Sequence, residues 1–122
     1  MTHAAINLHR LPGDLEPGRL HGFINLHGSR DGVTVNVDGY HTRWSVNLTA
    51  DAAAELARVL ATGDALAVAD IGIGRAVIDR EQAIDRVTLA IKTSTTTTAT
   101  EMTGMDARDL AQTLAALVKL PE

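Results

Sequence analysis

Amide, hydroxyl and imidazole side chains alternate with apolar ones in four stretches, residues 4–10, 19–27, 32–38 and 42–48. A period of two predicts strands, and alternate side chains of a strand share one face of a sheet. One face is then apolar. The other carries a polar, almost uncharged set: Asn7, His9, His21, Phe23, Asn25, His27, Thr34, Asn36, Arg43, Ser45 and Asn47. Such groups donate and accept hydrogen bonds, so they suit base edges or another uncharged polar ligand.

This polar face predicts a binding site for single-stranded DNA or RNA. An aromatic ring can stack a base, guanidinium groups can contact phosphate, and amides can read or position bases. The predicted site consists of Phe23, Arg19, His21, Asn25, Asn36, Arg43 and Asn47. An alternative explains the same pattern, because an antiparallel sheet often shows one polar face to water.

The histidines of the chain all lie in its first half, at His3, His9, His21, His27 and His41. Neutral imidazole is a common metal ligand. However, His21 and His27 would stand about 20 Å apart along one strand, so only His9 could share an ion with one of them. No carboxylate nearby in the sequence completes a ligand set, and we predict scattered surface histidines with no metal and no cofactor.

Motifs of catalysis are sparse in the sequence. There is no nucleophile elbow, no phosphate-cradling glycine-rich loop and no conspicuous acid–base pair. Gly72-Ile73-Gly74 lacks the third glycine and the helix of a pyrophosphate site, and a hairpin turn explains it better. The mixed charges of residues 79–86 are predicted to be solvated surface. We therefore predict a protein that is not an enzyme and has no catalytic residues.

Length, composition and charge narrow the class of protein. The chain has 122 residues, of which 45% are hydrophobic, and a net charge of -4. Those values predict one domain, residues 1–122, with no general attraction to polyanions. The chain has no cysteine, which excludes disulfides and thiolate ligands. Neither a leader segment nor a run of about 18 apolar residues is seen, which predicts a cytoplasmic protein without membrane contact.

Two parts of the chain are similar to each other at an offset of 54 residues. Residues 33–60 align with residues 87–114, and eight of the 28 paired positions are identical. Composition alone would give about two matches. The sequence therefore predicts an internal duplication, with repeat one at residues 1–63 and repeat two at residues 64–122.

Each repeat is predicted to contain four strands and a helix. In repeat two the strands are expected at residues 65–71, 75–80, 86–92 and 96–102. Thr49 and Thr103 are expected to cap the two helices, Thr103 in a capping box with Asp106. Trp44 occupies an inward position and is predicted to be core. The fold class is α+β, with two tandem ββββα repeats packed as a pseudo-dimer because neither half would bury much core alone.

This element order resembles the PUR repeat of the Pur-alpha family and, more loosely, the Whirly-type fold, in which two such units intertwine. The resemblance covers nearly the whole chain, but no sequence motif matches residue by residue. In those families the sheets carry polar and aromatic residues that bind single-stranded DNA or RNA, and the helices pack on the opposite faces. The resemblance implies the same use of open sheet faces here.

A second hypothesis is a protein-interaction or assembly module, such as an accessory factor of a phage or an actinobacterium. The threonine-rich run of residues 93–100 favours an edge strand through β-branching. Edge strands and helix faces can bind a protein partner or a second copy of the chain, which would give a homodimer. Affinity that falls as salt rises would favour nucleic acid; partner recovery or dimerisation that barely responds to salt would favour protein.

Overall fold

The computed structural model describes residues 2–9, 20–39 and 42–119 and contains two antiparallel four-stranded sheets, each followed by a helix. Sheet 1 has the order β1-β2-β3-β4, and sheet 2 has the order β5-β6-β7-β8. The elements are β1 (Thr2–His9), β2 (Leu20–Ser29), β3 (Gly32–Asp38), β4 (Arg43–Thr49), α1 (Ala50–Ala61), β5 (Leu66–Asp70), β6 (Gly74–Glu81), η1 (Gln82–Ile84), β7 (Arg86–Thr93), β8 (Thr97–Met102) and α2 (Gly104–Lys119). The predicted α+β class and its tandem ββββα order are confirmed.

The strands form where the sequence alternates, and the buried apolar side chains of both sheets face the helices. In β3 the side chains of Val33, Val35 and Val37 are buried while those between them are half-buried. Both helices begin at a threonine cap, as predicted. The Oγ1 atoms of Thr49 and Thr103 each accept a hydrogen bond at 3.1 Å from the backbone N–H three residues on. These caps satisfy donors that a helix terminus otherwise leaves unpaired.

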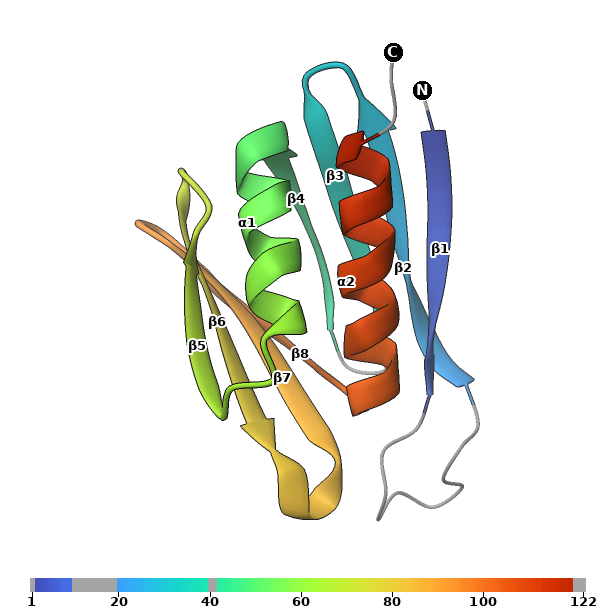
Figure 1. Ribbon diagram of the computed structural model, residues 1–122, viewed down its shortest axis with the longest axis vertical. Coiled ribbons are helices and arrows are strands. Elements are labelled where there is room, and N and C mark those ends of the chain that lie inside the picture. The colour runs from blue at the N-terminus through green and yellow to red at the C-terminus, as the bar shows by residue number, and fades with distance from the viewer. Residues whose placement is uncertain (1, 10–19, 40–41, 120–122) are drawn as a thin grey trace.

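The two helices lie side by side, and each of them packs against strands of both sheets (Figure 1). Helix α1 contacts β3 and β4 of sheet 1 and β5 and β6 of sheet 2, whereas α2 contacts β1, β2 and β3 and reaches β7. The apolar faces of both sheets therefore close one common core around the helix pair. Within the described parts of the chain, neither helix combines the length and apolar character needed to cross a membrane.

The bare GxG sequence is a hairpin turn, as predicted. Gly72 links β5 to β6 with a φ of +84°, a conformation that favours glycine, and its N–H donates to Asp70 Oδ1 at 2.9 Å. A Cβ on Gly74 would lie 2.0 Å from the carbonyl oxygen of Lys92. Both glycines are therefore required by the backbone of the turn.

Strand β1 is attached to the start of α2 by a buried carboxylate. Asp106 is fully buried, and its Oδ2 accepts the backbone N–H of His9 at 2.8 Å. The ring Nδ1 of His9 lies 2.9 Å from Asp106 Oδ1. The register of β1 on β2 shifts between Leu8 and His9, and this bulge turns His9 toward the helix. The prediction that His9 lies on the polar face is therefore wrong.

The same contact changes the predicted capping box. The Asp106 N–H donates to Thr103 Oγ1, which is the expected half of the motif. The carboxylate, which in a capping box would reach back to the cap, binds His9 instead. The start of the last helix is therefore held by the first strand.

Trp44 links an edge strand of sheet 1 to an edge strand of sheet 2. It lies on β4, the edge strand of sheet 1, and its Nε1–H donates to Thr100 Oγ1 on β8, the edge strand of sheet 2, at 2.7 Å. Thr100 is buried, while Trp44 is only half-buried and packs against the core. The prediction of a core tryptophan is thus correct for its contacts and wrong for its depth, because an edge strand leaves one side of the ring uncovered.

Replacing Asp106 should destabilise the fold strongly. Asp106→Ala removes the acceptor of the His9 N–H, and we expect the free energy of unfolding to fall by about 2–3 kcal/mol. Asp106→Asn keeps one acceptor and should lose about half as much. Denaturant unfolding measures both. Asp109→Ala, an exposed acid of the same helix, serves as the control, and a loss for Asp106→Ala as small as the control's would contradict this role.

Replacing Trp44 tests the link between the sheets. We expect Trp44→Ala to cost about 3 kcal/mol, the lower end of the range for a tryptophan, because the ring is only half-buried. Trp44→Phe keeps most of the packing but leaves Thr100 Oγ1 without its donor, and should cost about 1–2 kcal/mol. Urea unfolding curves provide the values. If Trp44→Ala lowers the free energy of unfolding by only about a few tenths of a kcal/mol, the ring does not hold the sheets together.

Candidate nucleic-acid interface

The face of sheet 1 that points away from the helices is open. The strand register arranges its side chains in three rows across β2, β3 and β4. We call this set the polar face, and its rows are Phe23, Asp38 and Arg43; Asn25, Asn36 and Ser45; and His27, Thr34 and Asn47. From β1, Asn7 stands beside Phe23 and His3 beside His27.

Hydroxyl groups fix the orientation of two amides on the polar face. Ser45 Oγ donates to Asn36 Oδ1 at 2.6 Å, and Thr34 Oγ1 donates to Asn47 Oδ1 at 2.8 Å. Because each amide oxygen accepts from its neighbour, the NH₂ groups of Asn36 and Asn47 remain as donors toward a ligand. The two pairs lie in adjacent rows on the same two strands. The face therefore presents prepositioned donors and no net charge at its centre.

Flat rings stand at both ends of the polar face. Phe23 is 41% exposed, which is unusual for a phenylalanine on a sheet and leaves its ring open to a stacking partner. At the other end the rings of His3 and His27 are in contact, with centroids 4.5 Å apart and planes tilted by 36°. Phe23 and His27 are four residues apart on β2, which corresponds to about 13 Å. Two stacking platforms thus flank the row of amides.

The polar face carries little charge. Arg43 is 83% exposed, and its Nη2 lies 3.6 Å from Asp38 Oδ1. An exposed pair at this distance contributes little stability, so the guanidinium can exchange Asp38 for a phosphate at small cost. The charges of Arg43 and Asp38 cancel each other. Base contacts rather than phosphate contacts are what this arrangement can offer.

The structure brings together five of the seven predicted site residues and leaves two undecided. Phe23, Asn25, Asn36, Arg43 and Asn47 share the polar face. Arg19 lies outside the described residues, and the side chain of His21 is not described. Sequence reasoning missed His3 and the pairing of Asp38 with Arg43. The period-two alternation puts the side chains of His3 and Asp38 on the same face as their neighbours. Given the strand register, it would therefore have identified both.

The histidines do not gather as a metal site within the described residues. No group of three or more histidine, cysteine, aspartate or glutamate side chains there could hold an ion. The sequence had allowed His9 to share an ion with His21 or His27. His9 is instead bound to Asp106, and the ring of His27 contacts the ring of His3.

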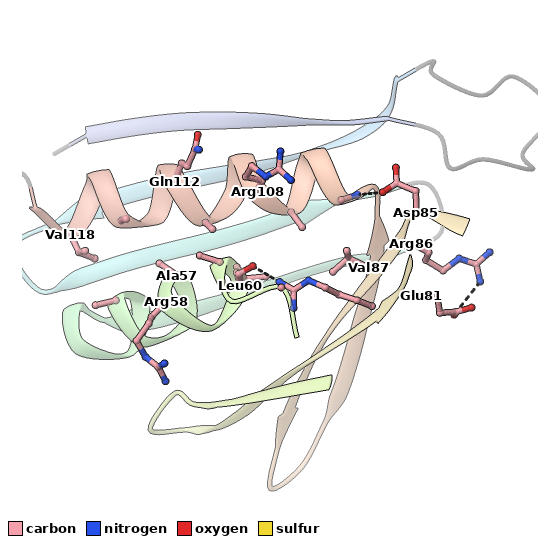
Figure 2. A pocket seen from close by; sticks show the side chains of 18 residues that line it. Ala57, Arg58, Leu60, Glu81, Asp85, Arg86, Val87, Arg108, Gln112 and Val118 are labelled. Carbon is pink, nitrogen blue, oxygen red and sulfur yellow. Dashed lines mark hydrogen bonds and ion pairs between the residues drawn. The ribbon is translucent and has the colours of Figure 1, made fainter. Parts of the chain in front are cut away.

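A groove of about 650 Å³ lies on the other side of the molecule, between α1, α2 and the β6–β7 hairpin (Figure 2). Alanines of both helices, such as Ala57 and Ala111, form much of its lining. Arg58 points away from α2, and Arg86 points away from both helices (Figure 2). The groove is therefore a cleft of small side chains with charged groups at its rim.

The rim charges of the groove are largely occupied by contacts within the protein. Arg80 donates to the carbonyl oxygens of Leu60 and Asp64 and so covers the end of α1. Arg58 binds Glu55, and this hydrogen bond raises the pKa of its guanidinium further above the ordinary value. Such groups are poorly placed to act as acids, bases or anion ligands.

The charged segment of residues 79–86 is more structural than predicted. Besides Arg80, Asp85 accepts the N–H of Gly104 at 3.1 Å, at the start of α2 (Figure 2). Arg86 lies within 3.8 Å of Glu81 and 3.7 Å of Glu101. The expectation of solvated charges therefore holds for the exposed Asp79, Glu81 and Asp85 and is wrong for the half-buried Arg80 and Arg86. Carbonyl and N–H groups at helix ends attract such side chains, and only the fold brings those ends to the hairpin.

Comparison with known proteins gives structural neighbours and no sequence family. No protein-family model matches the sequence, and no curated protein matches it. A guide-RNA-binding protein complex bound to a gRNA contains a chain with a TM-score of 0.57 and 15% identity, over 93% of this chain and 87% of that one. Trypanosoma bruciei MRP1/MRP2 gives a TM-score of 0.55 and 15% identity, over 95% of this chain and 83% of that one.

These likenesses establish the fold. They match nearly the whole tandem arrangement, and they do not single out a PUR or a Whirly-type architecture. At 15% identity, the roles of individual side chains in those proteins cannot be assigned to residues of the polar face. Function depends on particular side chains and not on the fold that carries them.

Proposed function

We propose that this chain is a non-enzymatic binding protein for single-stranded nucleic acid, and that the polar face of sheet 1 is the binding surface. The observation that carries the proposal is the pair of oriented amides, Asn36 and Asn47, together with the rings at the two ends of the polar face. Single-stranded nucleic acid offers unstacked bases with both a flat face and polar edges. The polar face supplies a partner for each.

Stacking and hydrogen bonding have different residues in this proposal. Phe23 stacks one base, and the His3–His27 pair supports another. Asn36 lies in the row between these rings and Asn47 in the row of His27, and both donate through NH₂ groups whose orientation is set by Ser45 and Thr34. Asn25 lies beside Asn36 and adds a third amide. Amides can donate and accept, so they can position bases without demanding one sequence.

Phosphate contacts are few in this proposal. Arg43 is the exposed cation of the described polar face, and Arg19 and His21 remain proposed contacts that the structure does not test. The chain as a whole is acidic, with a net charge of -4. We therefore infer modest affinity that depends more on bases than on the backbone.

The structural neighbours support nucleic acid as the ligand class. One of them is a guide-RNA-binding complex that contains its gRNA, which makes RNA the first ligand to test and single-stranded DNA the second. The likeness to PUR and Whirly-type folds in element order points to the same ligand class. Cytoplasmic location and a single domain over residues 1–122 also remain proposals, based on the sequence.

Loss of the Phe23 ring should weaken binding. We expect labelled single-stranded RNA to bind saturably at low salt, and Phe23→Ala to lower the affinity about tenfold, because a stacked base contributes about 1–3 kcal/mol. Fluorescence anisotropy of matched RNA and DNA oligomers measures the affinity and shows which of the two is preferred.

Ile84→Ala is the matched control for this experiment. Ile84 is 39% exposed, close to the 41% of Phe23, and belongs to the hairpin of the second repeat. It should bind like the wild type. Absence of saturable binding to either polymer at low salt would rule out the proposed function, and equal losses for both variants would move the site away from the polar face.

The salt dependence should be shallow. Each phosphate contact to a single strand contributes a slope of about −0.7 to log affinity against log salt, so Arg43 and Arg19 together predict a slope of about −0.7 to −1.4. Arg43→Ala should reduce its magnitude by about 0.7, whereas Arg30→Ala, at the exposed β2–β3 turn, should not change it. A slope steeper than about −4 would indicate a different, basic surface.

A further inference from the structure

The open face of sheet 2 carries an apolar row where sheet 1 carries amides. The register aligns Val68, Val77, Ala90 and Ala99 across β5, β6, β7 and β8. Val68 is 56% exposed, and Leu66, next to it on the same side of β5, is 64% exposed. An antiparallel sheet with one face in water normally has polar side chains at such positions.

The same row in the two repeats shows how far they have diverged. Asn36 and Ser45 of sheet 1 correspond, at the offset of 54 residues, to Ala90 and Ala99 of sheet 2. Asn36 pairs with Ser45, and Ala90 pairs with Ala99, in equivalent ladders. The position is therefore polar in one repeat and apolar in the other, although the backbone is the same. Val68 and Ala99 are exposed, and Val77 and Ala90 between them are half-buried. A contiguous apolar strip that reaches the surface in this way is typical of an interaction site.

Charged side chains of opposite sign flank the apolar row. On β6 the outward sequence is Arg75, Val77, Asp79, and all three point away from the helices. The row of Arg75 also contains Lys92 and, beside Arg75 on β5, Asp70, whereas the row of Asp79 also contains Glu101. The face thus has a mainly basic border with two cations and one acid, an apolar centre, and an acidic border with two acids.

We propose that this face binds the same face of a second copy of the chain, related by a two-fold axis that runs along the apolar row. Such an axis places Val77 opposite Val77 of the second copy. It also places the basic border of each copy over the acidic border of the other, so Arg75 meets Asp79 twice. A two-fold interface must be self-complementary, and the order basic, apolar, acidic along a strand satisfies that condition.

The size of the face sets the strength of the dimer. Four strands about 4.8 Å apart and three rows about 7 Å apart present about 400 Å² per copy. Two copies would bury about 800 Å², which is below the 1,200–2,000 Å² of stable complexes. The dimer should therefore be weak and reversible, with a dissociation constant on the order of tens of micromolar. The proposal does not rest on nucleic-acid binding, and the polar face stays free in the dimer.

Sedimentation equilibrium of the full chain, between about 5 and 500 µM, brackets that constant. The wild type should pass from monomer to dimer. Arg75→Glu and Asp79→Arg each place like charges opposite one another twice, and each should weaken dimerisation about tenfold. The double variant restores opposite charges and should return to within about threefold of the wild type. Arg30→Glu, with the same charge change on repeat one, should dimerise normally.

The decisive experiment mixes the two single variants. A chain with Arg75→Glu and a chain with Asp79→Arg are complementary to each other and repulsive to themselves, so native mass spectrometry of the mixture should show mainly the mixed dimer. Circular dichroism melts confirm that each variant is folded. A monomeric wild type at the highest concentration would overturn the proposal. The proposal would also be overturned if both single variants dimerised as tightly as the wild type. Folded single variants that form no mixed dimer would overturn it too, since either result would place the contact elsewhere.

Discussion

The fold depends on a buried carboxylate at the start of the last helix. Asp106 is fully buried and receives the backbone N–H of His9, 97 residues away, while its own N–H is held by Thr103. A buried carboxylate is costly unless hydrogen bonds replace its water, and these donors are present only when β1 lies along α2 (Figure 1). The first strand and the last helix therefore stabilise one another, and with the Trp44–Thr100 contact they make two repeats into one structure.

Duplication gave the chain two sheets with equivalent backbones and different outer faces. Both inner faces contribute to one core around the helix pair, so the side chains there are constrained in the same way in each repeat. The outer faces escape that constraint. One has become a row of amides with rings at its ends, and the other an apolar row between charged borders. Such divergence is what allows one outer face to be proposed for ligand binding and the other for self-association.

The composition of the polar face was largely predictable because strand alternation decides which side chains share a face. Phe23, Asn25, Asn36, Arg43 and Asn47 were grouped correctly from a period of two. Three features could not be predicted. A bulge turned His9 inward, an edge position left Trp44 half-buried, and helix ends recruited Arg80 and Asp85. Each depends on where a neighbouring element ends, which no local pattern records.

By itself the sequence determined the element order, the duplication, the inner faces of the sheets and the helix caps. All of these follow from local periodicity and from hydrogen bonds within a few residues. Tertiary structure alone decided which edges meet, that the rings of His3 and His27 complete the polar face, and that one row contains Val68, Val77, Ala90 and Ala99. Those neighbours come from different strands, and the register that unites them is fixed by packing both sheets against the same two helices.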